Sequence, residues 1–463
     1  MDYTKDFQYQ LIPLPWDIQA EKFGGRYDTA KEMIKRRIAR DGVPECLKKR
    51  LEIELIVMDH EEKEYNLTKQ QLYEQICEKL NDFTMEELDE LVLDGRIDFT
   101  YINGEQRFLR SSCSALIAVY PQLYPRRKDG YTVKKGVIDE IIDNVKDGDK
   151  FGAHIHIAHH LTLDPEEDVV GQTARVHIPI SWEGNPRVNN LKIVASTPEI
   201  KQIAPDESVH HTCYFETKAE KEKELCLEYE YDYIDTYRDM YNLDPKLCEK
   251  PVLQEIADKY LCEQLPHIAF TPYMKALAKE IVGDETNPLL KARLIYDYLT
   301  TRIRYRYTRS YTSVYDVSEY MMACGRGDCG MYALSFITLC RIVGVPAKWE
   351  SGTTATPGGI GMHDWAMFYI EGIGWRHVDG SFGSSANRNG NEKRRQFYFG
   401  NIDPYRNPCN CGQGEEFVPA KKYWRHDSCD NQAGEVEFET RASKRNEYSV
   451  RYEDKGIARI TEL

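Results

Sequence analysis

The chain has 463 residues, of which 41% are apolar and 11% aromatic, so it can form roughly two to four folded domains and is not intrinsically disordered. Acidic residues outnumber basic ones by 76 to 61, and the net charge is −15. Such a surface repels nucleic acid and anionic membranes, and we expect neither as a partner. The first thirty residues lack an apolar segment. We therefore expect the thirteen cysteines to be reduced thiols of a cytoplasmic protein.

Residues 1–145 are predicted to be a mainly helical N-terminal region. Thr84 and Glu87 form a capping box ahead of an apolar stripe, and Gly95 follows where that helix should end. Asn103-Gly104 then joins two short runs, which is a strong local signal for a β-hairpin. The pattern does not indicate what this region does.

In residues 150–235 the hydrophobic pattern changes to a period of two residues. Apolar and polar residues alternate in runs such as Ala153–Ile157 and Leu225–Tyr231, and turns containing Pro or Gly separate the runs. Several short strands at this spacing are typical of a small β-sandwich.

Helical periodicity returns after residue 265. Thr271-Pro272 and Asn287-Pro288 each begin a predicted helix, with Pro at the first helical position. Residues 265–430 are expected to form a mixed core of helices and strands, and residues 431–463 a β-rich tail.

Cys329 is the candidate nucleophile. Three glycines surround it, and apolar residues repeat with helical spacing directly after it. This places the sulfur at the first turn of a buried helix, where free N–H groups and the helix dipole favour an anion, so we expect a lowered thiol pKa. Asp328 opposes this effect unless its carboxylate caps the helix. Cys324 lies before the glycine-rich loop and is the weaker candidate.

His363 and Asp379 stand on two segments that are predicted to form a two-stranded ribbon. If the connecting loop is Glu371 to Ile373, or has any other odd length, the two side chains share one face of the ribbon. His363 can then face the sulfur while Asp379 holds the far ring nitrogen, as in a Cys-His-Asp triad. An even loop would put them on opposite faces.

The order of these motifs resembles that of the transglutaminase-like superfamily. The matching segments are Gly327-Asp328-Cys329, His363-Asp364-Trp365 and Trp375-Arg376-His377-Val378-Asp379, within residues 270 to 385. The resemblance implies an α+β fold in which a helical N-terminal region and a β-sandwich precede a papain-like transglutaminase core. It also implies that Cys329 is the nucleophile, His363 the general base and acid, and Asp379 the orienting residue. The family usually follows this Asp with Pro-Thr, whereas Gly380-Ser381 stands here.

By this resemblance the protein is expected to be a bacterial enzyme that attacks amide bonds of protein or peptide substrates through a thioester. Water as the acceptor would make it a cysteine protease or amidase, and an amine would make it an acyltransferase. Two alternatives remain open. One is a catalytically inactive scaffold that keeps the fold, and the other is a deglycosylase similar to peptide N-glycanase.

We expect Trp365, Tyr311 and Gly330 to contact the substrate. The backbone N–H of Cys329 is the natural first donor to an oxyanion. A second, side-chain donor is expected from the preceding loop, where four tyrosines compete: Tyr305, Tyr307, Tyr311 and Tyr315.

No cofactor is expected for the reaction. A structural zinc site is conceivable because the C-terminal part offers four ligands of the right type, Cys409, Cys411, His426 and Cys429. The Cys-x-Cys spacing is loose for zinc, and free thiols on a loop are the preferred interpretation. The sequence does not define the substrate, the acceptor or the oligomeric state.

Overall fold

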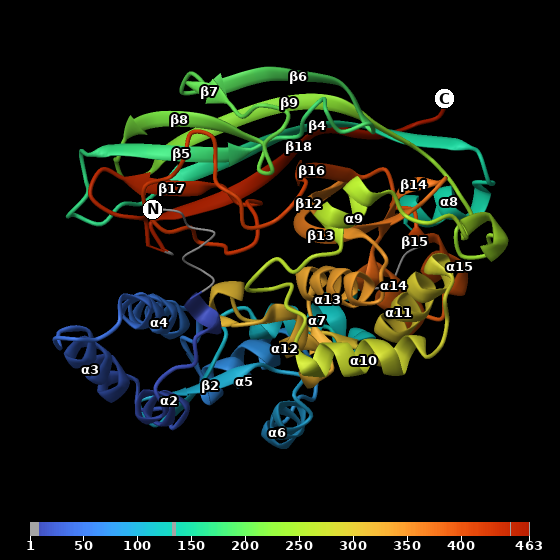
Figure 1. Cartoon of the computed structure of the whole chain (residues 1–463). Coiled ribbons are helices and arrows are strands. Elements are labelled where there is room, and N and C mark those ends of the chain that lie inside the picture. The colour runs from blue at the N-terminus through green and yellow to red at the C-terminus, as the bar shows by residue number, and fades with distance from the viewer. Residues whose placement is uncertain (1–8, 132–135, 445, 463) are drawn as a thin grey trace.

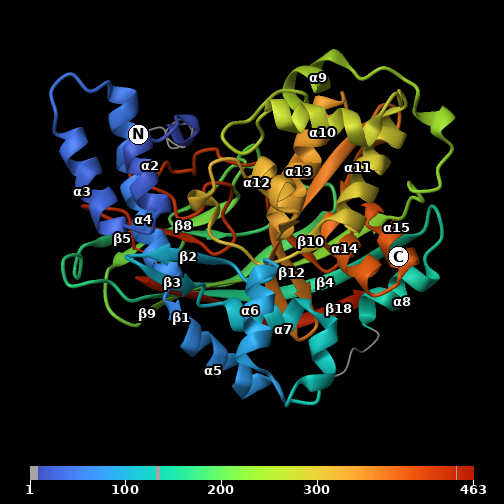
Figure 2. The ribbon, with the colours of Figure 1, turned by 90° about the horizontal axis from the view of Figure 1, so that it is seen from below.

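The computed structural model describes residues 9–131, 136–444 and 446–462 (Figure 1). A β-sandwich forms the upper layer in Figure 1, and the N-terminal helices and a mixed core of helices and strands lie side by side beneath it, as Figure 2 shows from below. The predicted α+β class is confirmed. No helix in the described ranges is both long enough and apolar enough to span a bilayer.

The N-terminal region combines helices with one small sheet of order β1-β3-β2. Thr84 caps α6 by accepting a hydrogen bond from the Glu87 N–H, which is one half of the predicted capping box, while the Glu87 carboxylate pairs with Arg126. Asn103-Gly104 joins β2 to β3, as predicted. The elements are η1 (Tyr9–Leu11), α2 (Trp16–Phe23), α3 (Tyr27–Ile38), α4 (Glu45–Glu64), β1 (Leu67–Thr68), α5 (Lys69–Lys79), α6 (Met85–Leu93), β2 (Phe99–Ile102), β3 (Glu105–Phe108), α7 (Ser112–Val119), η2 (Pro121–Arg126) and α8 (Val137–Asn144).

The sandwich consists of two four-stranded sheets, with orders β17-β5-β8-β7 and β18-β4-β9-β6. The C-terminal strands β17 and β18 pair antiparallel with β5 and β4, so these two strands of the predicted tail complete both sheets. Alternate side chains of β9 are buried, which explains the period of two in its sequence. The strands are β4 (Lys150–Leu163), β5 (Thr173–Pro179), β6 (Val188–Thr197), β7 (Gln202–Ile203), β8 (Thr212–Lys218), β9 (Lys223–Thr236), β17 (Glu435–Phe438) and β18 (Tyr448–Ile460).

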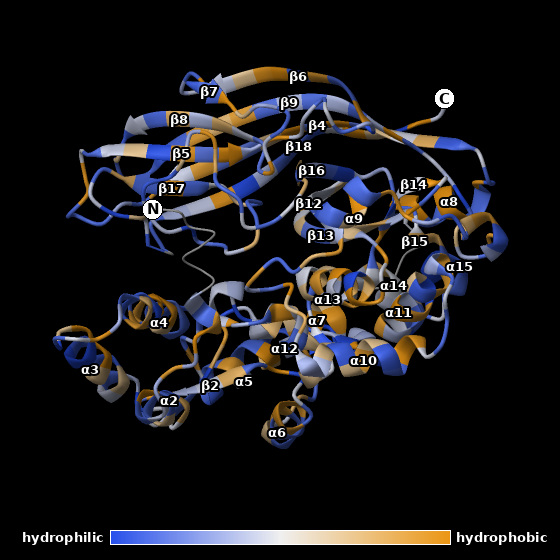
Figure 3. Ribbon diagram, viewed as in Figure 1, coloured by the Kyte–Doolittle hydropathy of each residue, from blue (hydrophilic) through white to orange (hydrophobic). Residues whose placement is uncertain are grey.

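The mixed core packs α13 against a five-stranded sheet of order β15-β14-β13-β12-β16. Nearly all side chains of α13 are buried, and Figure 3 shows this helix mostly in apolar colours. The elements are η3 (Pro245–Cys248), α9 (Gln254–Tyr260), α10 (Pro272–Val282), α11 (Pro288–Arg302), β10 (Arg304–Tyr305), η4 (Tyr311–Ser313), α12 (Val317–Cys324), β11 (Arg326–Gly327), α13 (Cys329–Ile342), β12 (Ala347–Thr356), β13 (Gly359–Ile370), β14 (Gly374–Val378), α14 (Gly380–Arg388), α15 (Glu392–Phe397), β15 (Phe399–Gly400) and β16 (Arg406–Asn410).

Buried ion pairs attach the N-terminal region to the core segment 305–315. Arg309 lies 3.1 Å from Asp98 and 3.5 Å from Glu61, and its guanidinium stacks over the Tyr65 ring. Burial alone would raise the pKa of Asp98, but the charges of Arg309 and Arg306 outweigh it and lower that pKa. The N-terminal helices therefore hold this segment through charges that have little access to water.

We expect Arg309→Met to lower the free energy of unfolding by about 3 kcal/mol at pH 7, because it leaves the buried Asp98 carboxylate with only the more distant Arg306, 4.0 Å away, as its cation. A lowered carboxyl pKa stabilises the fold above the unfolded pKa, and that contribution is lost as the pH falls through the folded pKa. The difference between variant and wild type should therefore shrink below about pH 4. Urea denaturation at pH 7 and pH 3.5 measures both values.

Arg36→Met is the matched control, since Arg36 pairs with Glu32 on the exposed face of α3. It should change the free energy of unfolding by less than about 0.5 kcal/mol. Equal effects of the two substitutions at pH 7 would contradict a buried attachment.

Candidate active site

A cleft of about 690 Å³ lies where three parts of the chain meet. The N-terminal region supplies one wall, the core supplies Cys329 and His363, and the segment between β16 and β17 supplies a third side. The residues used below that line it are Tyr305, Tyr307, Tyr311, Asp328, Cys329, His363, Asp364, Phe382, Asp427, Asp430 and Gln432. The candidate nucleophile and the candidate base thus open into one cleft.

Cys329 is the first residue of α13, as the glycine-rich sequence predicted. Asp328 is the N-cap and accepts a hydrogen bond from the Met331 N–H at 3.3 Å. The Tyr311 hydroxyl donates to the same carboxylate oxygen. The cap expected of Asp328 is therefore present.

His363 and Asp379 share a face of the β13–β14 ribbon. The loop between the strands consists of residues 371–373. This is the odd length that the sequence analysis required for the two side chains to share a face. His363 Nε2 lies 2.7 Å from Asp379 Oδ2. This contact leaves Nδ1 as the ring nitrogen for proton transfer.

Asp379 is held from several sides. It caps α14 and accepts hydrogen bonds from the Phe382 N–H at 2.8 Å and the Ser381 hydroxyl at 2.9 Å. Arg406 lies 3.2 Å from its Oδ2. The Gly380-Ser381 pair, where the family usually has Pro-Thr, thus supplies a hydrogen bond that fixes the carboxylate.

The charge of Asp379 is stabilised although the side chain is completely buried. Burial would raise its pKa, but the charges of His363 and Arg406 and the helix N–H hold the pKa far below its usual range. Arg406 is itself buried and stacks on the rings of Trp365 and Phe382. A cation and an anion therefore stand directly behind the imidazole.

The sulfur has a different neighbour from the one predicted. The Cys329 thiol donates a hydrogen bond to Asp364 Oδ2 at 3.3 Å, while His363 makes the predicted ring contact with Asp379. Burial raises the pKa of the Cys329 thiol well above its usual value, and the carboxyls of Asp364 and Asp328 raise it further. The expected fall in the thiol pKa is therefore wrong for this state, because burial and carboxyls outweigh the helix N-terminus.

Four carboxyls line the cleft together with the sulfur: Asp364 and Asp430 are buried, and Asp328 and Asp427 are partly buried. Burial raises the pKa of Asp328 to about 6 and that of Asp430 to about 7, and the pKa of Asp364 rises well above its usual value. Gln432 donates to Asp364 Oδ1, and at 3.2 Å to both Asp430 Oδ2 and the His363 carbonyl. We call Asp328, Asp364, Asp427 and Asp430 the carboxyl cluster.

Of the three residues predicted to contact the substrate, only one lines the cleft. Tyr311 lines the cleft. Trp365 is buried behind the wall and donates its Nε1–H to Glu350 at 2.6 Å, so the expected contact with substrate is corrected to a structural one. Gly330 is also buried, and a side chain there would collide with the Tyr311 hydroxyl and the Asp364 carboxyl. Its role is to let these two groups approach the start of α13.

The four tyrosines considered as oxyanion donors differ in their position and in the partners of their hydroxyl groups. Tyr315 packs between Arg50 and Glu54 of the N-terminal region and does not line the cleft. Tyr311 already donates to Asp328. Tyr305 and Tyr307 lie in the cleft wall and remain open.

The four candidate zinc ligands do not come together. Cys411 points to the Ser208 carbonyl and Cys409 to the Asn407 carbonyl, while His426 Nε2 lies 2.7 Å from the Ser443 hydroxyl. Each of these three side chains thus has a different partner, and all thirteen cysteines are free of disulfide bonds.

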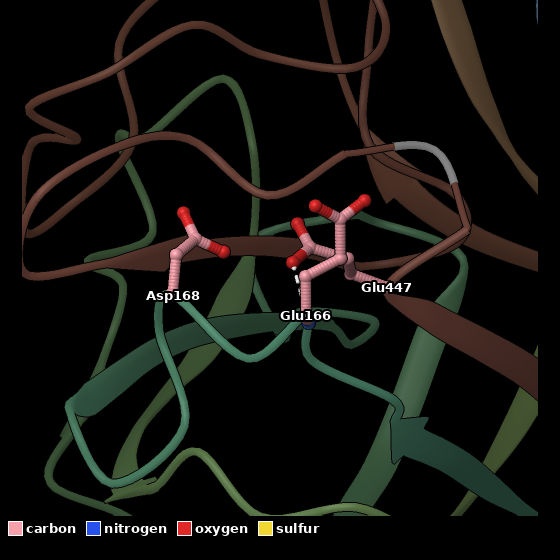
Figure 4. Close-up of side chains that lie close together, drawn as sticks. All are labelled: Glu166, Asp168 and Glu447. Carbon is pink, nitrogen blue, oxygen red and sulfur yellow. Dashed lines mark hydrogen bonds between the residues drawn. The ribbon is translucent and has the colours of Figure 1, made fainter.

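Within the described ranges, three carboxylates approach closely enough to share an ion: Glu166, Asp168 and Glu447 (Figure 4). Arg441 lies 2.8 Å from Asp168 and 2.7 Å from Glu447, and Lys444 pairs with Glu166. Two cations already pair with the three carboxylates, and these ion pairs tie the β4–β5 connection to the segment before β18.

Sequence reasoning missed three residues of the site. Asp364 was recognised only as the middle residue of the motif His363-Asp364-Trp365. Strand alternation predicts that its side chain points to the face opposite His363, so it was not expected in the site. Arg406 and Gln432 lie in segments with no local motif, and only the fold brings them to the cleft. A charged residue inside the buried strand β16 was the one available signal for Arg406.

Residues 275–380 match the family model described as the transglutaminase-like superfamily, and that range contains Cys329, His363 and Asp379. The chain contains a transglutaminase-like core. An uncharacterized protein of Haemophilus influenzae is 30% identical over 138 residues, which cover 25% of this chain and 37% of that protein. The similarity thus spans little more than a third of that relative.

Two solved structures are similar to this chain at low identity. A candidate cysteine protease from Cytophaga hutchinsonii has 14% identity and a TM-score of 0.42, covering 66% of this chain and 92% of its own. The periplasmic domain of TgpA from Pseudomonas aeruginosa has 13% identity and a TM-score of 0.28, covering 58% of this chain and 100% of its own. The transglutaminase-like core is the part of the chain that the family model covers.

Proposed function

We propose that the protein is a cysteine-dependent enzyme that cleaves or transfers amide bonds of protein or peptide substrates through a thioester. The observation that carries this proposal is the 2.7 Å contact between His363 Nε2 and Asp379 Oδ2, with His363 lining the same cleft as a cysteine at a helix start. A scaffold that had lost catalysis would have no need to keep a buried carboxylate charged behind an imidazole.

The proposed reaction has two halves. His363 Nδ1 takes the thiol proton, Cys329 Sγ bonds to the amide carbon, and the carbonyl electrons move to the oxygen. When they return, the C–N bond breaks and the amine leaves with the proton from His363. Water or an amine then gives His363 a proton as it attacks the thioester, and the thiol is restored.

The resting thiol is neutral and bonded to Asp364, so the attack begins with transfer of its proton to His363. We infer that an entering substrate displaces the Cys329–Asp364 contact, because both groups line the cleft that the substrate would fill.

Thirteen unpaired cysteines favour a reducing compartment, and we propose that the enzyme acts in the cytoplasm.

Trapping the thioester tests the proposal. The protein is incubated with a library of glutamine-containing peptides, quenched in acid and analysed by intact mass and peptide mapping. We expect an acyl adduct on Cys329 that hydroxylamine removes and converts into a peptide hydroxamate. Adding a primary amine should give an amide product if the enzyme is a transferase, and free acid if it is a hydrolase.

A second screen covers the other enzyme class. Glycopeptides carrying Asn-linked sugar are offered under the same conditions, and release of the glycan with conversion of Asn to Asp would favour the deglycosylase. Adducts spread evenly over Cys329 and the exposed Cys46, Cys262 and Cys324 would reject a specific nucleophile.

A further inference from the structure

Three arginines lie on one face of the small β10–β11 ribbon. Arg304 and Arg326 are direct partners in this parallel pair, so their side chains share a face. The Arg306 N–H donates to the Gly327 carbonyl at 2.8 Å, which extends the pairing and brings Arg306, two residues after Arg304, to the same face. Three guanidinium groups therefore lie together on a ribbon that leads directly to Cys329.

The N-terminal region covers this face with the turn that ends α6. The Arg306 guanidinium donates to the Gly95 carbonyl at 2.8 Å. Gly95 has a φ of +65°, and a Cβ there would collide with Arg326 Nη1, so the glycine lets that guanidinium approach. The next residue, Arg96, places its guanidinium 4.8 Å from the centre of the Tyr120 ring. We call the four basic residues the arginine cluster: Arg96, Arg304, Arg306 and Arg326.

Two nearby carboxylates balance the charge of the arginine cluster only in part. Asp94 lies 3.2 Å from Arg96. Asp98 lies 4.0 Å from Arg306 but is closer to Arg309, at 3.1 Å. In the described part of the chain, no ion pair includes either of the other two members of the cluster. A local excess of positive charge thus exists in a chain whose net charge is −15.

Three buried donors of this region have no hydrogen-bond partner among the described residues: the Tyr120 hydroxyl, Arg306 Nε–H and Arg326 Nε–H. Tyr120 is only 6% exposed and Arg306 only 8% exposed. The charges of all four arginines act on the Tyr120 hydroxyl and oppose the rise in its pKa that burial causes. Buried donors normally have an acceptor, and a guanidinium offers none. The groups in this cluster therefore cannot satisfy one another.

The shape of the region is compatible with an anion that has several oxygens. A gap of about 10 Å³ is lined by Arg96, Asp98, Tyr120 and Arg306, and it has room for one atom the size of a water oxygen. Arg304 is exposed, so the cluster can be reached from solvent. One oxygen of a tetrahedral anion fits the gap, while its other oxygens remain available to the outer guanidinium groups.

We propose that the arginine cluster and the Tyr120 hydroxyl form a binding site for a phosphate-type oxyanion, either free phosphate or a phosphate monoester. Such an anion supplies negative charge and several acceptor oxygens, and the paired N–H groups of a guanidinium match its geometry. This site is separate from the cleft chemistry and requires no substrate.

The position of the site connects it to the catalytic cleft. Tyr305 and Tyr307, which alternate with two of the arginines, line the cleft. Arg326 precedes Cys329 by three residues, and Tyr120 directly follows α7, whose end forms part of the opposite wall. A bound anion therefore holds one wall of the cleft against the segment that carries the nucleophile.

Isothermal titration calorimetry of the full chain with inorganic phosphate tests the site. The ionic strength is kept at about 0.15 M, and the negative net charge of the chain disfavours unspecific binding of anions. We expect one saturable site with a Kd on the order of 1 mM. Excess phosphate should raise the melting temperature by about 1–3 °C. Phenyl phosphate is titrated in parallel, and the tighter of the two ligands shows whether the natural ligand is a monoester or the free ion.

Substitutions locate the bound anion. Arg326→Met should weaken phosphate binding about tenfold or more, and Tyr120→Phe about fivefold. Arg326→Met should not lower the melting temperature in phosphate-free buffer, because it relieves repulsion between like charges. Arg388→Met is the matched control: Arg388 is an exposed arginine that lines the catalytic cleft outside the cluster, and its loss changes the net charge equally. It should leave the Kd for phosphate unchanged.

Three results would overturn the site. One is the absence of saturable binding to wild type up to about 20 mM phosphate. Another is a Kd that Arg388→Met weakens as much as Arg326→Met does, which would place the anion in the catalytic cleft or nowhere specific. The third is a lower melting temperature of Arg326→Met in phosphate-free buffer, which would mean that this guanidinium already has its partner within the protein. None of these measurements uses turnover, so they are independent of the test of the proposed function.

Discussion

Cys329→Ala should abolish turnover, with kcat falling about 10⁴-fold or more. The thioester cannot form without the sulfur, and the remaining groups of the cleft can only bind and polarise the amide. Release of amine from a peptide identified by the adduct screen measures the loss. The variant should still bind that peptide, because alanine removes only the sulfur at the first turn of α13.

Cys324→Ala is the matched control for this substitution. Cys324 lies five residues earlier at the end of α12, is exposed, and was the rival nucleophile on sequence grounds. It should keep full activity and the full adduct at position 329. Activity that survives in Cys329→Ala and disappears in Cys324→Ala would reverse the assignment.

Asp379→Asn should lower kcat about 10²- to 10⁴-fold with a smaller change in KM. The amide has nearly the same shape but no charge, so the imidazolium of His363 loses its stabilising anion and its tautomer is no longer fixed. Arg406 would also lose one of its two anions inside the protein. Steady-state kinetics give the first effect, and a lower melting temperature reports the second.

Asp403→Asn separates these two effects. Asp403 accepts a hydrogen bond from Arg406 and also from the Tyr398 hydroxyl at 3.1 Å, but does not touch His363. It should cost stability and leave kcat within about threefold of wild type, because the imidazole keeps its own anion. Equal losses of kcat in both variants would mean that Asp379 acts through packing.

The local parts of the site were predictable from sequence. The position of Cys329 at a helix start follows from glycines and helical periodicity, both of which are local patterns. The shared face of His363 and Asp379 follows from strand alternation and the length of one turn. Each of these arguments uses residues that are neighbours along the chain.

The environment of the sulfur was not predictable in the same way. The carboxyl cluster unites Asp328, Asp364, Asp427 and Asp430 from three distant segments, and no local pattern indicates that they meet. Burial of the thiol, together with the carboxyls of Asp364 and Asp328, reversed the expected direction of the thiol pKa. Electrostatics at a buried site depends on every group around it, so an argument from one helix terminus was incomplete.

The pairing of β17 and β18 was missed for a related reason. Their sequences look like strands, but nothing in residues 431–463 indicates that their partners are β5 and β4, far upstream. Only completed sheets show that these residues belong to the sandwich.

The pairing of β17 and β18 with the distant strands β5 and β4 also affects how the polypeptide folds during translation. During translation, β4 emerges from the ribosome long before β18, the neighbour that covers its edge along nearly its whole length. An uncovered edge strand is prone to aggregate, and such distant pairings form slowly. Asp430 and Gln432 lie just ahead of β17 and follow Cys329 and His363 along the chain, so a nascent chain lacks part of the wall around its sulfur until these residues have been synthesised. Premature activity toward neighbouring polypeptides would thereby be restrained by the order of synthesis alone.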